Sequence, residues 1–371
     1  MKNVLIILIA AMLTVSCSSL MNYKPAKDEF KNVEFEKKVT IVEAPVEEPK
    51  TPPVETNAAK SDSVATTVTT SSDATKADKT STKAEKAKTK DGKSSQVNGE
   101  SAKSKAGKSA KDQKAIPIGR QPEIEDREGF DQKRRPLVDP FRVGEVVEHE
   151  VGYLGATAGT LKFMVKPFAV VNGKKSYNFF IDLKSTTFFS RVYAVDDKVQ
   201  TYVDYEELVP HVFKMNIRDS GQVKEAQSYF DNINLKADYW EHRFTEKHGH
   251  EEKKLSWSIL PYSQNPFSAV FYMRVFKWVL GKEYSFRVAD DEKNVVFRGR
   301  AIEKAVLDTE AGKFNAIKIK AEVYSRGNLA KATDFYMWIS DDDRKYILRI
   351  EVKLPIGSLV SEVVDIVEGK P

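Results

Sequence analysis

Hydrophobic and polar residues follow a strand-like pattern through most of the second half of the chain. Val146–Leu154 alternates between apolar and polar positions, and Thr160–Val171 and Lys175–Thr187 are rich in β-branched and aromatic residues. Such runs are typical of strands with one buried face. Asn172-Gly173 stands between two of them and is the strongest hairpin signal in the chain. The pattern predicts strands that follow one another through short turns.

The same signals continue to the C-terminus without the strand–helix alternation of a parallel sheet. Turns are predicted at Asp196-Asp197 and Asp219-Ser220-Gly221, and a polar loop at Glu246–Lys254. The prediction is a mainly β fold, a large curved antiparallel meander that forms a half-barrel, a barrel or a sandwich. The further predicted strands are Arg191–Val195, Val199–Asp204, His211–Arg218, Val223–Asp231, Leu235–Phe244, Leu255–Ile259, Glu283–Ala289, Val295–Leu307, Phe314–Tyr324, Ala332–Ile339, Tyr346–Leu354 and Leu359–Val367.

One stretch, Tyr262–Gly281, has helical spacing instead. Asn265 before Pro266 is typical of a helix start, and Gly281 stands where a left-handed C-terminal cap would fall. The residues between are apolar on nearly every face, which predicts a buried helix at about 265–280. A helix of about 15 residues spans about 22 Å, too short to cross a bilayer. We expect it to pack against the curved sheet.

The N-terminus predicts export. Residues 1–16 form a signal peptide, with Lys2 before an apolar run. The boundary resembles that of bacterial lipoproteins, in which a small residue precedes a cysteine that receives a diacylglycerol. Ser16 and Cys17 match this pattern, although the leucine usual three residues before the cysteine is Thr14 here. Ordinary cleavage beside an incidental cysteine is the alternative interpretation.

Cys17 is also the only cysteine in the chain, so no disulfide can form within it. Several acyl chains on this residue would give a stable membrane attachment. Ser18 after the cysteine resembles the outer-membrane sorting pattern of Gram-negative lipoproteins. The sequence therefore predicts a protein anchored through acylated Cys17 in the cell envelope, in the outer membrane and facing the periplasm.

Residues 17–135 are predicted to form a disordered tether. No aromatic residue lies between Phe35 and Phe130, and residues 60–115 hold 13 lysines and 7 acidic residues. Such a composition buries too little apolar surface to offset the entropy of the chain. A flexible coil of this length spans about 55–65 Å. The lysines either contact anionic envelope groups or only keep the spacer soluble; without interleaved aromatic residues, nucleic acid is not an expected partner.

From residue 136 to 371 the composition is that of one folded domain. Four blocks of it resemble the bacterial exported family labelled domain of unknown function 3108, over roughly 140–368. The resemblance implies an envelope β-domain without established activity, loosely similar to the half-barrels of lipoprotein carriers that bind acyl chains on a concave face. The matching residues are Tyr153 with Gly159; Tyr193–Asp204 with Pro210; Asn265–Arg274; and Trp338–Asp342 with Arg344, Arg349–Glu351 and Gly357-Ser358.

No catalytic motif is present in the sequence, whether a serine elbow, a His-Glu-x-x-His helix or a glycine-rich nucleotide loop. We therefore expect no enzymatic activity and no cofactor. His248-Gly249-His250-Glu251-Glu252 has residue types that bind metals, but a flexible charged loop holds ligands poorly. A solvated turn is the prediction there, with no metal site. Asp341-Asp342-Asp343-Arg344 is likewise first a turn between strands.

Arg274 is the sharpest candidate for function, because a lone arginine on an apolar helix needs a partner or water. A salt bridge to Asp341, Asp342 or Glu351 is the first interpretation. Gripping an anionic head group and reaching out to solvent are the alternatives. A groove for a ligand is predicted from Arg274 together with aromatic residues, of which most are core: Phe267, Phe271, Trp278, Trp257 and Trp338.

Two functions therefore remain open. In the first, the domain binds a hydrophobic or glycan ligand on the concave sheet, so that a lipid or an envelope polymer is the partner. In the second, it is a structural or scaffolding lipoprotein without a small-molecule ligand, whose protein partners the sequence does not identify. A cavity beside Phe271 and Trp278 would favour the first, and a filled core would favour the second. An enzyme acting on envelope polymers is a third, weaker alternative.

Overall fold

The computed structural model describes residues 32–44, 135–325, 328–329, 335–354 and 357–370. The predicted signal peptide 1–16, Cys17 and residues 45–134 of the predicted tether lie outside this part. The elements are α2 (Val33–Lys38), β1 (Ile41–Glu43), β2 (Val146–Tyr153), β3 (Ala156–Val171), β4 (Lys174–Ser185), η2 (Phe189–Arg191), β5 (Asp196–Asp204), β6 (Pro210–Asp219), β7 (Gln222–Asp231), β8 (Lys236–Thr245), β9 (Gly249–Ser258), α3 (Pro266–Tyr272), η3 (Met273–Val275), β10 (Glu283–Asp290), β11 (Lys293–Thr309), β12 (Gly312–Ser325), β13 (Asn328–Leu329), β14 (Phe335–Ser340), β15 (Ile347–Lys353) and β16 (Ser358–Val367).

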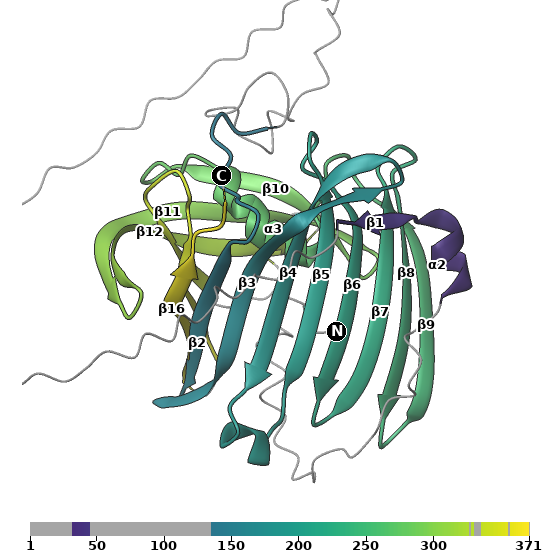
Figure 1. The fold of residues 1–371 in the computed structure, drawn as a ribbon, viewed down its shortest axis with the longest axis horizontal. Helices are drawn as coiled ribbons and strands as arrows, with labels where there is room; N and C mark the ends of the chain where they lie inside the picture. Colours follow the sequence, from purple (N-terminus) through teal and green to yellow (C-terminus); the bar gives the residue numbers. More distant parts are fainter. Residues whose placement is uncertain (1–31, 45–134, 326–327, 330–334, 355–356, 371) are drawn as a thin grey trace, which may run out of the picture. The chain divides into compact units, whose positions relative to one another are not determined.

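These strands form one 16-stranded sheet, and each named pair of strands is antiparallel. The order is β10-β11-β12-β14-β15-β16-β2-β3-β4-β5-β6-β7-β8-β9, with β1 beside β3 and β13 beside β12. The predicted mainly β, curved meander is confirmed. Since β9 and β10 end the order, the sheet is open rather than a closed barrel (Figure 1).

Local turn chemistry predicts most of the strand ends. Asn172 and Gly173 have φ angles of +48° and +81°, as expected of the tight hairpin turn between β3 and β4. One predicted turn and one predicted strand are wrong. Asp196-Asp197 begins β5, opposite Lys184 and Leu183. The predicted strand Arg191–Val195 does not form: Arg191 ends η2, and Val195 makes only an isolated bridge to Asp219.

The predicted polar loop Glu246–Lys254 is also too long. β9 already begins at Gly249 and pairs with β8 along its whole length. Its residues are half-buried or exposed on both faces, because β9 is the last strand of the sheet. An edge strand of this kind lacks the apolar alternation by which a strand is recognised.

The buried helix begins as predicted and ends early. Asn265 accepts hydrogen bonds from the N–H groups of Phe267 and Ser268, and the Ser268 hydroxyl accepts one from the Asn265 N–H, which together make a capping box. After η3 the backbone is extended at Phe276. Gly281 has a φ of +79° but donates to Ala301 instead of capping a helix.

The early end of the helix has a packing reason. Extended backbone carries the rings of Phe276 and Trp278 toward β10, where Phe276 stacks on Phe286 and Trp278 contacts Tyr284. The indole of Trp278 also donates to the carbonyl of Met273, at 2.9 Å, which satisfies a carbonyl at the helix end. A helix continued to residue 280 would lose these contacts.

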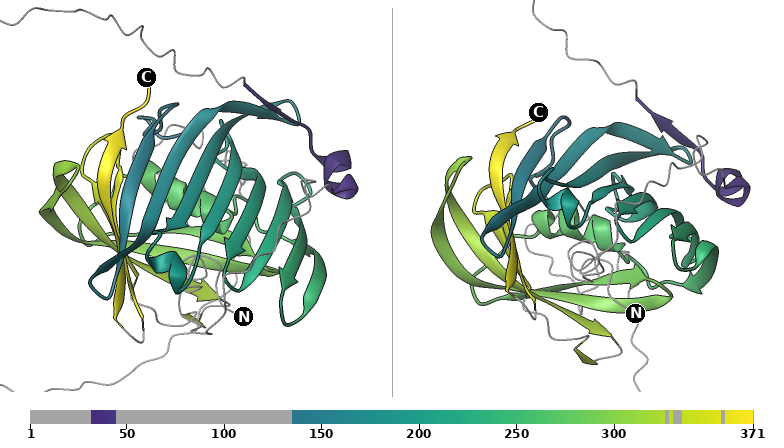
Figure 2. Two further views of the ribbon diagram at one scale, coloured as in Figure 1. Left: turned by 60° about the horizontal axis from the view of Figure 1, so that its bottom comes forward. Right: turned by 90° about the horizontal axis from the view of Figure 1, so that it is seen from below.

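The core lies between the sheet and this segment. Every residue of α3 and η3 is buried. One apolar cluster joins this segment to strands in both halves of the sheet, that is, before and after the segment in the sequence. Figure 2 shows α3 inside the curve of the sheet. Among the described residues, no helix has the length and apolar content needed to span a membrane.

Residues 32–44, which we call the N-terminal clasp, correct the predicted tether. They form α2 and β1, and β1 pairs with β3 from Ile41 opposite Val171 to Glu43 opposite Ala169. The prediction of disorder for residues 17–135 is therefore wrong for residues 32–44. The helix and the strand of the clasp are too short to show a recognisable hydrophobic period in the sequence. Their partners lie more than 100 residues away in the sequence.

His149 on β2 is a fully buried polar residue, with 0% exposure. One ring nitrogen lies 2.9 Å from the carbonyl oxygen of Ile347 on β15, and the other lies 2.9 Å from the hydroxyl of Ser361 on β16. Burial lowers the pKa of His149 to about 4. The ring is therefore neutral near pH 7 and ties three neighbouring strands together.

This pKa predicts acid sensitivity. Between pH 6.5 and about 4 the unfolded chain binds a proton at His149 that the folded chain does not bind, so the free energy of unfolding falls as pH falls. The contribution is complete above pH 6.5, and about 3 kcal/mol is lost by pH 4. Denaturant unfolding of the protein and of His149→Gln at several pH values measures it. The variant should lack this part of the slope; an unchanged slope would show that His149 is not responsible.

Candidate functional site

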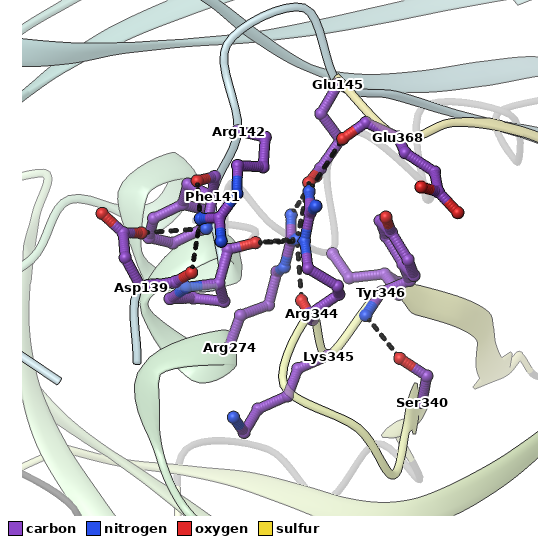
Figure 3. Close-up of polar contacts among 12 residues, drawn as sticks. Asp139, Phe141, Arg142, Glu145, Arg274, Ser340, Arg344, Lys345, Tyr346 and Glu368 are labelled. Carbon is purple, nitrogen blue, oxygen red and sulfur yellow. Dashed lines mark hydrogen bonds and ion pairs between the residues drawn. The ribbon is translucent and has the colours of Figure 1, made fainter. Parts of the chain in front are cut away.

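A buried carboxylate between two arginines is the most unusual polar arrangement in the fold. Glu145 lies immediately before β2, with its side chain 1% exposed, and the side chain of Arg274 in η3 is 0% exposed. Arg274 Nη1 is 2.5 Å from Glu145 Oε1, and its Nη2 is 3.1 Å from Oε2. Arg344, whose side chain is 21% exposed, places Nη2 2.5 Å from the same Oε2. We call these three residues the Glu145 cluster (Figure 3).

Backbone carbonyls complete the cluster. Arg274 Nη2 also donates to the carbonyls of Pro140 and Arg344, at 3.2 and 2.9 Å. Arg344 donates to the carbonyls of Pro140 and Glu368, at 3.1 and 2.9 Å. Four distant parts of the chain therefore meet here: the segment before β2, η3, the β14–β15 turn and the residues after β16.

The electrostatics of the cluster give it a structural role. One carboxylate faces two guanidinium groups, and both guanidiniums lie near aromatic rings: Arg274 is 5.0 Å from the ring centroid of Phe141, and Arg344 is 5.2 Å from that of Tyr346. Guanidinium groups stay protonated in proteins, so neither can act as a base. The one carboxylate is paired with both guanidinium groups, so the cluster holds charge in place.

The partners predicted for Arg274 are wrong, although a salt bridge is confirmed. Asp342 instead accepts hydrogen bonds from the N–H groups of Arg344 and Lys345 and closes the turn between β14 and β15. Asp341 pairs with Lys304 at 2.7 Å, and Glu351 lies within β15. The turn needs the carboxylate of Asp342 for its own backbone, as predicted for an Asp-rich turn.

Three aromatic groove candidates lie in the helix or just after it, and their side chains are buried. Phe271 is 0% exposed, and its ring stacks on Phe179 with centroids 4.2 Å apart. Phe267 meets Phe213 edge to face, at 5.4 Å, and Trp278 is 4% exposed. These residues, with Arg274, lie together as predicted. They pack against the chain itself.

The other two candidates lie on strands and not on the helix segment. Trp338 on β14 is 7% exposed and belongs to the same core cluster as Phe267, Phe271 and Trp278. The ammonium of Lys318 is 4.9 Å from the ring centroid of Trp338. Trp257 is half-buried on β9, opposite Ala237 on β8. The five aromatic groove candidates therefore lie in or against one filled core, to which Trp257 contributes from the edge strand β9.

Sequence reasoning missed two carboxylates with raised pKa values, Asp197 near the start of β5 and Asp290 at the end of β10. Burial, together with the negative charge of Asp219, raises the pKa of Asp197 to about 7. Burial also raises the pKa of Asp290, at the end of β10, to about 6, while the positive charges of Lys253 and Lys224 act against this shift. Carboxylates with raised pKa values are common at functional sites. Nothing in the local sequence distinguishes these two from other turn aspartates.

The histidine cluster behaves as a hairpin end. His248 is exposed in the β8–β9 turn, and its N–H donates to Thr245 Oγ1 at 3.1 Å. His250 lies on β9 with its ring 5.3 Å from that of His242. In the part of the chain that the structure describes, no three His, Cys, Asp or Glu residues are placed to hold a metal ion.

Comparison with known proteins adds a family. The model of the family described as "Protein of unknown function (DUF3108)" matches residues 148–364, which is more than half of the chain. This confirms the resemblance drawn from the four sequence blocks. No curated protein matches the chain.

Solved structures of low similarity were also found. A "beta-barrel-like protein of domain of unknown function DUF1849" from Brucella abortus is 9% identical, with a TM-score of 0.38 over 61% of this chain and 98% of that one. A "putative lipoprotein" from Parabacteroides distasonis is 10% identical, with a TM-score of 0.28 over 62% and 99%. A "putative exported protein" with a YmcC-like fold from Bacteroides fragilis is 8% identical, with a TM-score of 0.27 over 62% and 98%.

The Glu145 cluster predicts that removing its carboxylate alone costs more stability than removing the carboxylate and the Arg274 charge together. Among the described residues, Glu145 is the one carboxylate paired with Arg274, so Glu145→Gln should lower the free energy of unfolding by about 3–5 kcal/mol, measured by denaturant titration. Adding Arg274→Met should recover part of this loss, because no buried charge then lacks a partner. Glu251→Gln, in the exposed pair with Arg243, is the matched control and should change little. Equal effects of the two glutamate variants would contradict the buried role.

Proposed function

Since the chain belongs to the family of proteins of unknown function DUF3108, we propose that it is a lipid-anchored envelope protein whose domain is a scaffold filled by its own helix. The supporting observation is the packing of α3 and η3, in which every residue is buried against the sheet. In this proposal the domain works through its surface, and it is assigned neither a catalytic role nor a cofactor.

The cellular address rests on the N-terminal sequence. The apolar run before Ser16-Cys17 and the single cysteine support export and acylation. Ser18 after the cysteine supports the outer membrane, with the domain in the periplasm. The partners in this proposal are the membrane, through acylated Cys17, and other components of the envelope.

The filled core is what separates a scaffold from an acyl-chain carrier. A carrier needs an apolar space of several hundred Å³ for its ligand. At the predicted groove, Phe271 already stacks on Phe179, and Phe276 on Phe286. These contacts would have to break for a lipid to enter beside the helix. The cost of exposing them favours a permanently filled inner face.

The ends of the hairpins support contact with a partner. Leu154 in the β2–β3 turn and Phe188 and Val192 beside η2 are 65%, 71% and 66% exposed. The N–H of Thr186, just before Phe188, donates to Ala158 near the same turn. Large exposed apolar side chains at one end of a sheet are a common feature of protein contact surfaces.

A second candidate function is binding of a polar ligand, such as an envelope glycan, at Asp197 or Asp290. The observation that favours it is the pair of raised carboxylate pKa values at Asp197 and Asp290. A carboxyl group with a pKa of about 7, as at Asp197, is partly protonated at neutral pH and can then donate as well as accept hydrogen bonds, which suits sugar hydroxyls. This would be a ligand site distinct from the predicted aromatic groove.

Lipid attachment is tested by cell fractionation. Cys17→Ser should move the protein from the membrane fraction to the soluble periplasmic fraction, since acyl chains can no longer be attached to residue 17. The matched control is Ser18→Ala, which keeps the cysteine. If the Cys17→Ser form stays with the membrane, attachment does not depend on acylation.

The scaffold proposal is tested by native mass spectrometry of the soluble Cys17→Ser form, purified without detergent. We expect the mass of the chain alone. An additional mass lost on organic extraction would contradict the proposal and identify a lipid ligand. An additional mass that resists extraction but disappears in Asp197→Asn would support the polar-ligand candidate instead.

A further inference from the structure

The N-terminal clasp begins with a helix that cannot be stable alone. α2 has 6 residues, and the Asn32 side chain caps it by accepting from the N–H groups of Glu34 and Phe35, at 3.1 and 3.2 Å. Isolated helices shorter than about 12–15 residues are marginal in water. The helix therefore depends on what it packs against.

That partner is an apolar patch on the outer face of the sheet. Phe35 and Val39 are 4% and 7% exposed, and they complete a cluster separate from the main core. Phe35 meets Trp240 edge to face, with ring centroids 6.0 Å apart. The clasp covers aromatic and aliphatic residues of five strands: Ala169, Val171, Tyr202, Val212, Tyr229 and Trp240.

Polar contacts fix the clasp along its length. Lys38 pairs with Asp238 at 2.6 Å, an aspartate whose side chain is only 9% exposed. Glu34 pairs with Lys254 at 2.5 Å and accepts from the indole of Trp240 at 3.1 Å. Glu43, at the other end, accepts from Tyr202 and from Gln200.

The β3–β4 turn holds the middle of the clasp. Asn172 donates to the carbonyl of Lys38 at 3.0 Å and accepts from the N–H of Thr40 at 2.8 Å, and its own N–H donates to the carbonyl of Thr40 at 2.9 Å. Its residue type was expected only to shape the hairpin. Here the same side chain also pairs the turn with the clasp.

We infer that the clasp, and not residue 135, is where the domain is attached to its membrane tether. This rests on the proposed acylation of Cys17. Only residues 18–31, which are 14 residues, then separate the acylated residue from the clasp, and they extend at most about 50 Å. Residues 45–134 connect two points of the same domain. The clasp is thus a spacing device that limits how far the domain can lie from the bilayer.

Cutting the chain between the clasp and residue 135 tests this inference. A site for a sequence-specific protease is placed within residues 60–115 of the full-length acylated protein, which is then bound to phospholipid vesicles. After cleavage, most of the domain should sediment with the vesicles, held only by the clasp. The same cut in Phe35→Asp/Val39→Asp should release the domain to the supernatant.

Two controls make each outcome decisive. Val33→Asp, on the same helix but 61% exposed, should retain the domain after the cut. A protease site within residues 18–31 should release it in every variant. The inference is overturned if the cut parent protein is released to the same extent as the double variant.

Failure of the anchor is distinguishable from failure of the clasp. If the uncut protein does not sediment with vesicles, the proposed acylation is wrong. The clasp is then judged in solution, where the two fragments of the cut protein should elute together in gel filtration and those of Phe35→Asp/Val39→Asp should elute apart. Separate elution of the parent fragments would overturn the clasp itself.

Discussion

The inner face of an open curved sheet is an apolar surface that the chain must cover with its own residues. Here the segment from Asn265 to Trp278 covers it, and burial of its aromatic side chains supplies the main stabilisation, at about 25 cal/mol per Å² of apolar area. The Glu145 cluster then fixes where that segment lies. A buried ion pair of this kind adds little net stability, but it is costly to leave incomplete. Apolar burial therefore drives the fold, and the cluster selects one position for the helix.

The sequence predicts the features that depend on neighbours in the chain. Turn residues such as Asn172-Gly173 and the capping residue Asn265 act within a few positions, so hairpins and the helix start follow from local rules. The helix end does not, because it depends on where Phe286 and Tyr284 lie in space. The clasp is missed for the same reason. Its thirteen residues have an ordinary polar pattern, and they are ordered by contacts with distant strands, such as the patch around Trp240 and the pairing with β3.

The site shows the same division. An arginine on an apolar helix must have a partner, and this much follows from the composition of residues 266–275. That the partner is Glu145, 129 positions earlier, follows only from the strand order that brings the start of β2 near the β14–β15 turn. The groove residues show a second limit. Aromatic side chains that line a pocket and those that fill it have the same sequence pattern, and here Phe267, Phe271 and Trp278 fill it.

The adjacency of β2 and β16 has a consequence for how the protein is made. The first and last long strands of the domain pair along their whole length, from Val146 opposite Val367 to Tyr153 opposite Leu359. Contacts so distant in sequence form slowly, since a long loop must close before they are made. In a chain that emerges with its N-terminus first, one edge of β2 stays unpaired until residues 358–367 are available. Completion of the sheet, and with it the burial of Glu145 beside Arg344, therefore comes only once β16 has been made.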